Sequence, residues 1–214
     1  MADATAPAGV QGGMAGRQGK GPALFISDLH LSPERPNLVK LFLDFVRDVA
    51  PGAGELHILG DFFETWVGDD ELNDSFNLEI VRALSGLAAQ GVSLYFLPGN
   101  RDFLAGTEFA RAAGLTLPPD PVRREIFGTP TLLSHGDIFC SDDAAYQAFR
   151  KQVRDPAVQA DFLARPVEER HAITRAMRER SEQAKAGKKP EIMDVNADAI
   201  LGAIRQWGVA RIIH

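Results

Sequence analysis

The chain has 214 residues, of which 45% are hydrophobic and 24% are charged, and a formal net charge of −6 at pH 7. This length allows one sizeable domain with an insertion, and the lack of a long apolar run argues against a membrane-spanning helix. The negative charge argues against a nucleic-acid-binding protein, and a single cysteine, Cys140, excludes an internal disulfide.

The first 22 residues are rich in Gly, Ala, Gln and Pro and do not have the basic start and apolar stretch of a secretory signal. We expect residues 1–22 to form a disordered extension. The folded domain is then expected to span residues 23–214.

From residue 23 onward, short apolar runs alternate with segments of helical periodicity, a pattern that predicts an α/β sandwich. The predicted strands are Leu24–Ser27, Leu56–Leu59, Val92–Leu97, Thr131–Ser134 and Ala210–Ile213. The predicted helices are Asn37–Val49, Asn77–Ala89, Phe103–Ala113 and Asn196–Trp207. A proline-rich connector, Leu117–Val122, leads into Arg123–Phe127, which we expect to form a hairpin with the strand after Gly128.

Residues 142–190 carry no strand signal and are predicted to form a helical insertion. Between Ala144 and Pro190 there are 11 Lys and Arg residues against 6 Asp and Glu residues, a local net charge of +5. Two interpretations of this basic segment remain open. It is either a solvated helical face or a lid over an anionic substrate.

Four of the predicted strands end in Asp, His or Asn beside small residues, in the stretches FISDLH, HILGDFF, YFLPGN and LLSHGD. In open α/β sheets, ligands bind in the crevice outside the carboxyl ends of the strands. Each polar residue alone is explained as well by a turn, a helix cap or an ordinary histidine. Their recurrence at four strand ends favours one shared site.

The residue types at these strand ends suit a divalent metal. Asp28 and His30 are two positions apart, so an extended backbone points both side chains the same way. Asp61 follows a glycine that allows a tight turn, Asn100 offers a neutral oxygen and His135 a second imidazole. Two divalent ions held in this way lower the pKa of a bridging water and clamp a phosphoryl group.

The stretches FISDLHLSPERP, ILGDFFETWVGDD, PGNRDFL, LSHGDIFCSDDAAYQAFR and IMDVN together resemble the calcineurin-like metallophosphoesterases. Within that superfamily they are similar to the UDP-2,3-diacylglucosamine pyrophosphohydrolases of lipid A biosynthesis. The resemblance covers Leu24 to His214. It implies a sandwich of two mixed sheets flanked by helices, with the helical insertion as a lid.

The same resemblance implies hydrolysis of the pyrophosphate of UDP-2,3-diacylglucosamine to UMP and 2,3-diacylglucosamine 1-phosphate (lipid X). Two Mn²⁺ ions would activate the attacking water, which would attack the phosphorus on the UMP side. One ion would be held by Asp28, His30 and Asp61, and the other by Asp61, Asn100 and His135, with Asp61 bridging. The implied catalytic residues are Asp61, Asn100, Arg101 and His135. The implied substrate contacts are Asn100, Arg101, Asp143, Ser181, Lys185 and Lys188.

Arg101 stands where protein phosphatases and nucleases of this superfamily usually have histidine. Its guanidinium suits a bidentate grip on phosphate, and the open alternative is a surface salt bridge to Asp102. Lys185, Lys188 and Lys189 are similarly explained by a diphosphate contact or by solvated charge.

By resemblance, the protein would also bind its substrate's two acyl chains and lie on the cytoplasmic face of the inner membrane as a peripheral monomer. Apolar positions of the insertion would line an acyl cleft or form the insertion's own core. These positions are Tyr146, Phe149, Val153, Phe162, Ile173 and Met177.

The family pattern ends with a Gly-His-x-His loop that supplies one further ligand to each metal. This chain stops at His214, where that loop would begin, and we carry no ligand role onto His214. We expect the native protein to continue beyond it. If these 214 residues were the whole molecule, weak metal binding and little turnover would be expected.

Two other functions remain open. One is a metallophosphoesterase that acts on a soluble nucleotide or phosphodiester. The other is a metal-free interaction scaffold, which predicts eroded ligands, whereas Asp28, His30, Asp61, Asn100 and His135 are all present.

Overall fold

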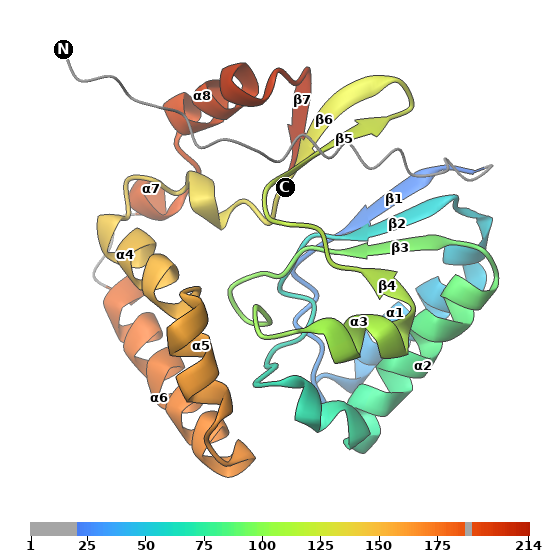
Figure 1. The fold of residues 1–214 in the computed structure, drawn as a ribbon, viewed down its shortest axis with the longest axis horizontal. Coiled ribbons are helices and arrows are strands. Elements are labelled where there is room, and N and C mark those ends of the chain that lie inside the picture. The colour runs from blue at the N-terminus through green and yellow to red at the C-terminus, as the bar shows by residue number, and fades with distance from the viewer. Residues whose placement is uncertain (1–20, 187–189) are drawn as a thin grey trace.

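The computed structural model describes residues 21–186 and 190–214 (Figure 1). The predicted disordered extension therefore lies almost wholly outside the described residues. Two β-sheets stack on each other, with helices on both outer faces and a group of three long helices beside the stack. The predicted α/β sandwich is confirmed.

The first sheet contains four parallel strands in the order β1-β2-β3-β4. Its strands are β1 (Ala23–Ile26), β2 (Glu55–Ile58), β3 (Ser93–Phe96) and β4 (Leu115–Thr116). The connections between them carry the helices α1 (Pro36–Asp48), α2 (Ser75–Ala89) and α3 (Thr107–Ala113), with the 3-10 turns η1 (Ala50–Gly52) and η2 (Asp69–Asn73). We expected both sheets to be mixed, but this one is parallel throughout its described strands, as short strands joined by crossover helices require.

The second sheet contains three strands in the order β5-β6-β7. The predicted hairpin is formed by β5 (Val122–Ile126) and β6 (Thr129–Leu133), which are antiparallel, and β7 (Arg211–Ile213) joins β6 in parallel. Helix α8 (Ala197–Trp207) covers the outer face of this sheet (Figure 1).

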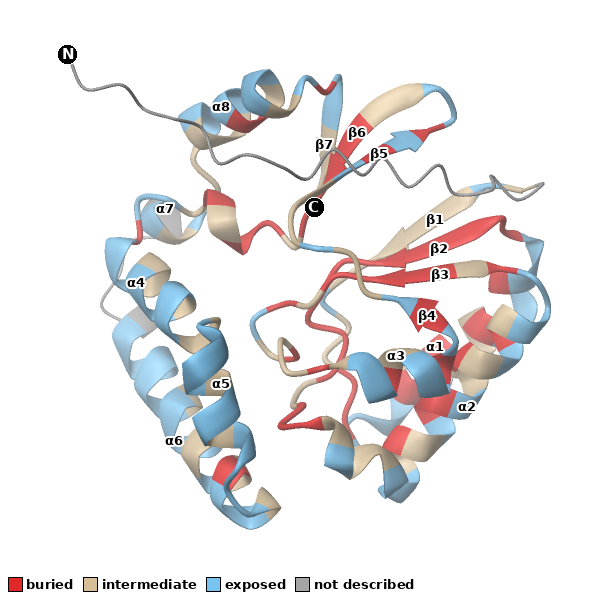
Figure 2. Ribbon diagram, viewed as in Figure 1, coloured by how far each residue is buried: buried red, intermediate tan, exposed pale blue. Residues whose placement is uncertain are grey.

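Three apolar clusters hold these layers together (Figure 2). The largest packs the first sheet against α1, α2 and α3 around Phe62, Phe96 and Phe109. The second packs α8 on the second sheet, and the third joins the two sheets through Leu59, Leu97 and Leu133. Because the last three residues lie at strand ends, the inter-sheet core sits directly behind the strand-exit loops.

A buried polar group also lies between the sheets. His57 stacks between Phe25 and Tyr95 on the neighbouring strands, with ring centroids 4.9 and 4.8 Å apart. His57 Nε2 lies 2.8 Å from Glu55 Oε2, and the Arg124 guanidinium of β5 covers the Tyr95 ring at 4.0 Å. Burial lowers the pKa of His57, so this imidazole is held neutral.

The segment after β6 begins with the 3-10 turn η3 (Asp137–Phe139) and continues as α4 (Ala144–Val153), α5 (Pro156–Leu163) and α6 (Val167–Ala186). These three helices, with the loops that join them, are called the lid below. They lie beside the sandwich (Figure 1), and their residues are mostly exposed (Figure 2). The short helix α7 (Pro190–Met193) follows. No helix within the described ranges is long and apolar enough to span a membrane.

The predicted strands agree with the observed ones within two residues at each end, and the main differences concern α3 and β4. Helix α3 begins at Thr107, four residues later than predicted. Its start is fixed by Asp69, whose carboxylate accepts hydrogen bonds from the backbone N–H groups of Gly106, Glu108 and Phe109. Since this cap lies 37 or more positions away in the chain, no local signal announces it.

Candidate metal centre

The strand-exit loops adopt backbone conformations that few residues tolerate. Asp28, His30 and Asp61 all have positive φ values, of 55°, 49° and 49°. The loops after β1 and β2 remain paired there, because Asp28 N donates to Gly60 O at 3.0 Å and His30 N donates to Asp61 O at 2.9 Å. These left-handed turns bring the side chains of two neighbouring loops to one edge of the sheet.

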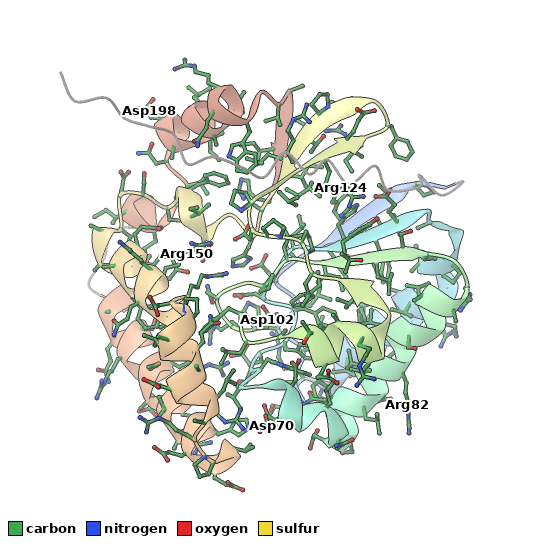
Figure 3. All side chains as sticks on the ribbon, viewed as in Figure 1. Asp70, Arg82, Asp102, Arg124, Arg150 and Asp198 are labelled. Carbon is green, nitrogen blue, oxygen red and sulfur yellow. The ribbon has the colours of Figure 1, made fainter. Side chains whose placement is uncertain are left out.

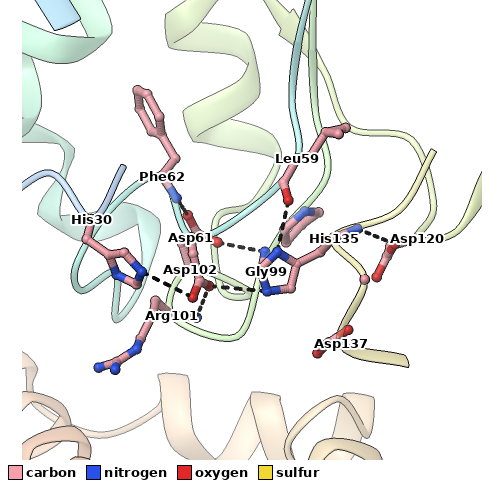
Figure 4. Close-up of polar contacts among 12 residues, drawn as sticks. His30, Leu59, Asp61, Phe62, Gly99, Arg101, Asp102, Asp120, His135 and Asp137 are labelled. Atoms are coloured by element: carbon pink, nitrogen blue, oxygen red, sulfur yellow. Dashed lines mark hydrogen bonds and ion pairs between the residues drawn. The ribbon is translucent and has the colours of Figure 1, made fainter. Parts of the chain in front are cut away.

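Asp61 lies at the centre of the group and is 4% exposed (Figure 4). Its Oδ2 atom is 3.7 Å from His30 Nε2, and its Oδ1 atom is 3.7 Å from His135 Nε2. Oδ1 also accepts a hydrogen bond of 2.9 Å from the backbone N–H of Arg101. The two carboxylate oxygens thus face two different imidazoles.

The His135 ring is oriented by a backbone contact. Its Nδ1 atom lies 2.9 Å from the carbonyl oxygen of Leu59, so Nδ1–H donates there and Nε2 is left facing Asp61. Burial lowers the pKa of His135, but the carboxylates of Asp61 and Asp137 raise it by more, and the net shift is upward. A field that favours a proton on this ring also favours a cation beside it.

Two glycines allow the loops to meet. A Cβ atom on Gly99 would lie 2.2 Å from Asp61 Oδ1, and one on Gly60 would lie 2.6 Å from the Gly99 Cα atom. Neither space can accept a side chain without moving backbone. The Gly60-Asp61 and Gly99-Asn100 pairs are therefore required by close approach of the two loops.

Asp102 fixes the same two loops from beneath. It is fully buried and accepts backbone hydrogen bonds from Phe62 at 2.7 Å, Phe63 at 3.2 Å and Gly99 at 2.8 Å. Burial, with the nearby charge of Asp61, raises the pKa of Asp102 to about 6. The alternative of a surface salt bridge between Arg101 and Asp102 is wrong, because Asp102 is buried with its oxygens bound to backbone N–H groups and Arg101 pairs with Glu64.

The donor atoms of this crevice fit a divalent cation. Ligand atoms of Asp28, Asp61 and His135 all lie within 4.8 Å of one another. Two ligand atoms that each sit about 2.1 Å from one ion are at most about 4.2 Å apart, so the 3.7 Å separations between each histidine and Asp61 allow a shared ion. Asn100 is exposed on the loop between Gly99 and Arg101. All five predicted ligands therefore lie on the strand-exit loops.

Arg101 pairs with a residue that the sequence did not single out. Its Nη1 atom donates to Glu64 Oε1 at 3.2 Å, and the same oxygen is 3.1 Å from Nη1 of Arg178 on α6. The other oxygen, Glu64 Oε2, is 2.9 Å from His30 Nδ1. Glu64 therefore touches two strand-exit loops and the lid.

The lid also contacts the sandwich through Arg150, which Figure 3 labels on α4. Arg150 of α4 donates to Asp137 at 2.9 Å and to Asp120 at 3.1 Å, and Tyr146 OH donates to Asp137 at 2.7 Å. Asp120 in turn accepts from the backbone N–H of His135 at 3.1 Å. The motif SDDAAYQAFR, part of a stretch that carries the family resemblance, thus contains the residues that join the lid to the loop of a candidate ligand.

The predicted substrate contacts on the lid are only partly described. Asp143 is buried and caps α4 by accepting from Tyr146 N at 3.0 Å, while Ser181 is exposed on α6. The side chain of Lys185 and all of Lys188 lie outside the described part of the chain. Among the apolar lid positions, Phe149 and Met177 are exposed, each at 41%, and the half-buried ones are Tyr146, Val153, Phe162 and Ile173.

A two-sheet α/β sandwich with carboxylates and imidazoles converging at its strand ends is typical of one class of metal-dependent phosphoester hydrolases. The chain belongs to the calcineurin-like phosphoesterase family, whose model matches residues 21–183.

Three curated relatives carry the name UDP-2,3-diacylglucosamine hydrolase. That of Xanthomonas campestris pv. campestris (strain B100) is 46% identical over 89% of this chain and 80% of its own length. That of Hahella chejuensis is 45% identical over 90% and 79%, and that of Aromatoleum aromaticum is 48% identical over 90% and 78%. A solved structure from Aquifex aeolicus aligns with a TM-score of 0.38 at 20% identity, over 61% of this chain and 70% of that one, and carries no argument.

Proposed function

We propose that the protein hydrolyses the pyrophosphate bond of UDP-2,3-diacylglucosamine, giving UMP and 2,3-diacylglucosamine 1-phosphate (lipid X), a step of lipid A biosynthesis. The similarity to hydrolases named for this substrate supports the choice of substrate. The observation that carries the chemistry is Asp61, whose two oxygens each face an imidazole across 3.7 Å.

In this proposal one Mn²⁺ is held by Asp28, His30 and Asp61 and a second by Asp61, Asn100 and His135. Such ions supply an activated water and neutralise charge on the phosphoryl oxygens when bound. The donor set of carboxylates, imidazoles and an amide oxygen suits manganese, because this metal accepts both oxygen and nitrogen ligands.

The residues around the ligands orient the substrate. Arg101 places its backbone N–H on Asp61 and its guanidinium on Glu64, so it presents a fixed cation at the edge of the crevice. Arg178 brings a second guanidinium from α6 to the same carboxylate. Two guanidinium groups sharing one carboxylate leave a net positive charge for a diphosphate.

The lid residues Asp143, Ser181, Lys185 and Lys188 are proposed to contact the sugar nucleotide. Exposed apolar side chains such as Phe149 and Met177 supply surface for acyl chains, which gain about 0.8 kcal/mol for each CH₂ buried. The basic balance of the lid supports peripheral attachment to the anionic cytoplasmic face of the inner membrane. We propose a monomer, which sedimentation of the purified protein tests directly.

The test is UMP release from UDP-2,3-diacylglucosamine with Mn²⁺ present, followed by mass spectrometry in H₂¹⁸O. We expect UMP as the product, with the heavy oxygen in UMP rather than in lipid X. Bis(p-nitrophenyl) phosphate and UDP-glucose serve as comparison substrates. Equal or faster hydrolysis of either would replace the proposal with a phosphoesterase for soluble substrates, and no bound Mn²⁺ would favour the scaffold.

A further inference from the structure

Glu64 occupies a position that neither the metal ligands nor the substrate contacts explain. It lies in the loop after β2, three residues beyond Asp61, and its side chain is 32% exposed. Its carboxylate contacts groups from three separate segments, which are the β1 exit loop, the β3 exit loop and α6. We propose that Glu64 is a positioning residue that couples docking of α6 to cation binding at His30. This inference rests on the metal site of the proposed function.

The first half of the argument concerns the imidazole of His30. Its Nε2 atom faces Asp61 Oδ2, so a cation shared with Asp61 requires Nε2 to be unprotonated and Nδ1 to carry the proton. Nδ1 is buried and lies 2.9 Å from Glu64 Oε2, in a geometry that falls short of an aligned hydrogen bond. Among the described residues, Glu64 is the group that the structure places against this nitrogen.

His135 provides an internal comparison. Its Nδ1–H is held by the carbonyl of Leu59, a neutral backbone group whose place is set by the strand. His30 is held instead by a charged side chain. Because a carboxylate partner makes a ligating imidazole more basic and fixes its tautomer, Glu64 strengthens the His30 side of the centre.

The second half concerns the two arginines. Arg101 Nη1 and Arg178 Nη1 both reach Glu64 Oε1, at 3.2 and 3.1 Å. Burial and the neighbouring Arg101 lower the pKa of Arg178, and its Nε and Nη2 atoms are buried without a hydrogen-bond partner in the described structure. The contact with Glu64 is therefore the direct ion pair that holds this guanidinium at the crevice, and the charge of Asp61 adds to the attraction.

One carboxylate thus serves a candidate metal ligand with one oxygen and the lid with the other. Arg178 holds one oxygen of Glu64 while the other oxygen lies against His30, so withdrawing Arg178 frees the carboxylate to turn away from His30. Docking of α6 therefore favours cation binding at His30, and by thermodynamic linkage cation binding favours the docked position of α6 to the same extent. The two processes are predicted to depend on each other through Glu64.

The N-terminal end of α6 offers a matched control. His171 contacts Glu71, and Arg170 contacts Asp70 and the carbonyl oxygen of Val67, all on the loop after β2. These contacts dock the same helix without touching a candidate ligand. Glu71→Gln therefore removes a lid contact of similar chemistry while leaving the centre alone.

The experiment measures Mn²⁺ binding by calorimetry and hydrogen exchange of α6, with the full chain and three variants. Glu64→Gln is expected to weaken Mn²⁺ binding at one of the two sites by about 10- to 100-fold, the usual effect of losing a partner of a ligating histidine. Added Mn²⁺ should slow exchange over residues 174–184 in the unchanged protein and fail to do so in this variant. Glu71→Gln should keep the Mn²⁺ affinity unchanged and the response of residues 174–184 intact.

Arg178→Met tests whether the lid affects Mn²⁺ binding, as distinct from support of His30 by Glu64 alone. It also keeps the test valid if Glu64→Gln folds poorly. It should lower Mn²⁺ affinity by a smaller factor than Glu64→Gln, although Arg178 touches no candidate ligand. Unchanged Mn²⁺ affinity in Glu64→Gln, or in Arg178→Met, would overturn the proposal. Both readouts need no turnover, so inactivity towards UDP-2,3-diacylglucosamine would reject the proposed substrate and leave this result standing.

Discussion

The crevice at the strand ends and the lid are built on opposite principles. In the crevice, positions are set by backbone: left-handed turns at Asp28 and Asp61, glycine contacts, and amides that bind Asp102. In the lid, positions are set by arginine side chains that reach acceptors on the sandwich. Arg150 spans 30 positions to Asp120, and Arg170 spans 103 positions to Val67.

This difference separates rigidity from adjustability. A candidate centre held by backbone cannot shift without moving strands, whereas an ion pair can exchange partners when an anionic ligand arrives. The contacts of the lid are therefore easier to exchange than those that position the strand-exit loops. Four variants test the contrast, beginning with the one expected to have the largest effect.

Asp61→Ala removes the carboxylate that faces both imidazoles. We expect Mn²⁺ binding to be lost and kcat/KM to fall by more than about 100-fold. Loss of a hydrogen-bond partner of a metal ligand already lowers activity by up to about 100-fold, and loss of the ligand itself should cost more. Metal content and UMP release measure the effect. Asp44→Ala removes a half-buried carboxylate of α1 that pairs with Lys40 and Arg47, away from the crevice, and should change neither. Near-normal turnover of Asp61→Ala would refute the shared-ion arrangement.

Arg150→Met removes the guanidinium through which α4 contacts the sandwich. It leaves Asp120 and Asp137, whose side chains are 2% and 6% exposed, without their shared guanidinium. Removing one partner of a buried pair costs about 3 kcal/mol in free energy of unfolding, which urea denaturation measures. The control Arg165→Met breaks an exposed pair with Glu169 and should cost less than about 0.5 kcal/mol. Equal effects of the two variants would contradict the described attachment.

Gly99→Ala tests the backbone constraint of the crevice. The added methyl group would meet Asp61 Oδ1 at 2.2 Å and displace it, and a misplacement of about 1 Å can lower kcat about 100-fold. Gly86→Ala on α2 meets no atom within 4 Å and should stabilise the protein by about 0.5 kcal/mol or more. A wild-type kcat in Gly99→Ala would contradict the steric constraint between the two loops.

The pH dependence of stability tests the buried imidazole of His57, which lies between the two sheets and, among the described residues, does not contact the lid. Because burial lowers the pKa of folded His57, the unfolded chain binds more protons as the pH falls below about 6.5. This group therefore destabilises the fold on acidification, by at most about 1.4 kcal/mol per pH unit. His57→Phe keeps the ring stack and should remove that part of the slope between pH 6.5 and 5. Identical slopes would mean that the folded imidazole titrates normally.

The parts of the molecule that local patterns control were predictable. Strands and helices followed from periodicity, and the shared edge of Asp28, His30, Asp61 and Asn100 followed because parallel strands end at one edge. His135 follows β6 of the second sheet, and it joins the group because the two sheets stack. Whether these residues bind two metals is still a prediction.

The remaining features depend on pairs that are distant in the chain. Glu64 and Arg178 are 114 positions apart, and Asp69 caps a helix 37 to 40 positions away. The residues next to Glu64 in the sequence do not indicate that its partner is Arg178. Such contacts are decided by tertiary packing, which composition and spacing do not encode locally.

The three left-handed residues at the strand ends imply a conflict between durability and activity. Non-glycine residues in this conformation cost about 1 kcal/mol each relative to relaxed alternatives, and two of them, Asp28 and Asp61, bring carboxylates close together. Variants chosen only for heat resistance should therefore collect glycine or asparagine at positions 28, 30 and 61. The most heat-resistant variants of this protein would therefore be those that had lost the side chains of the crevice.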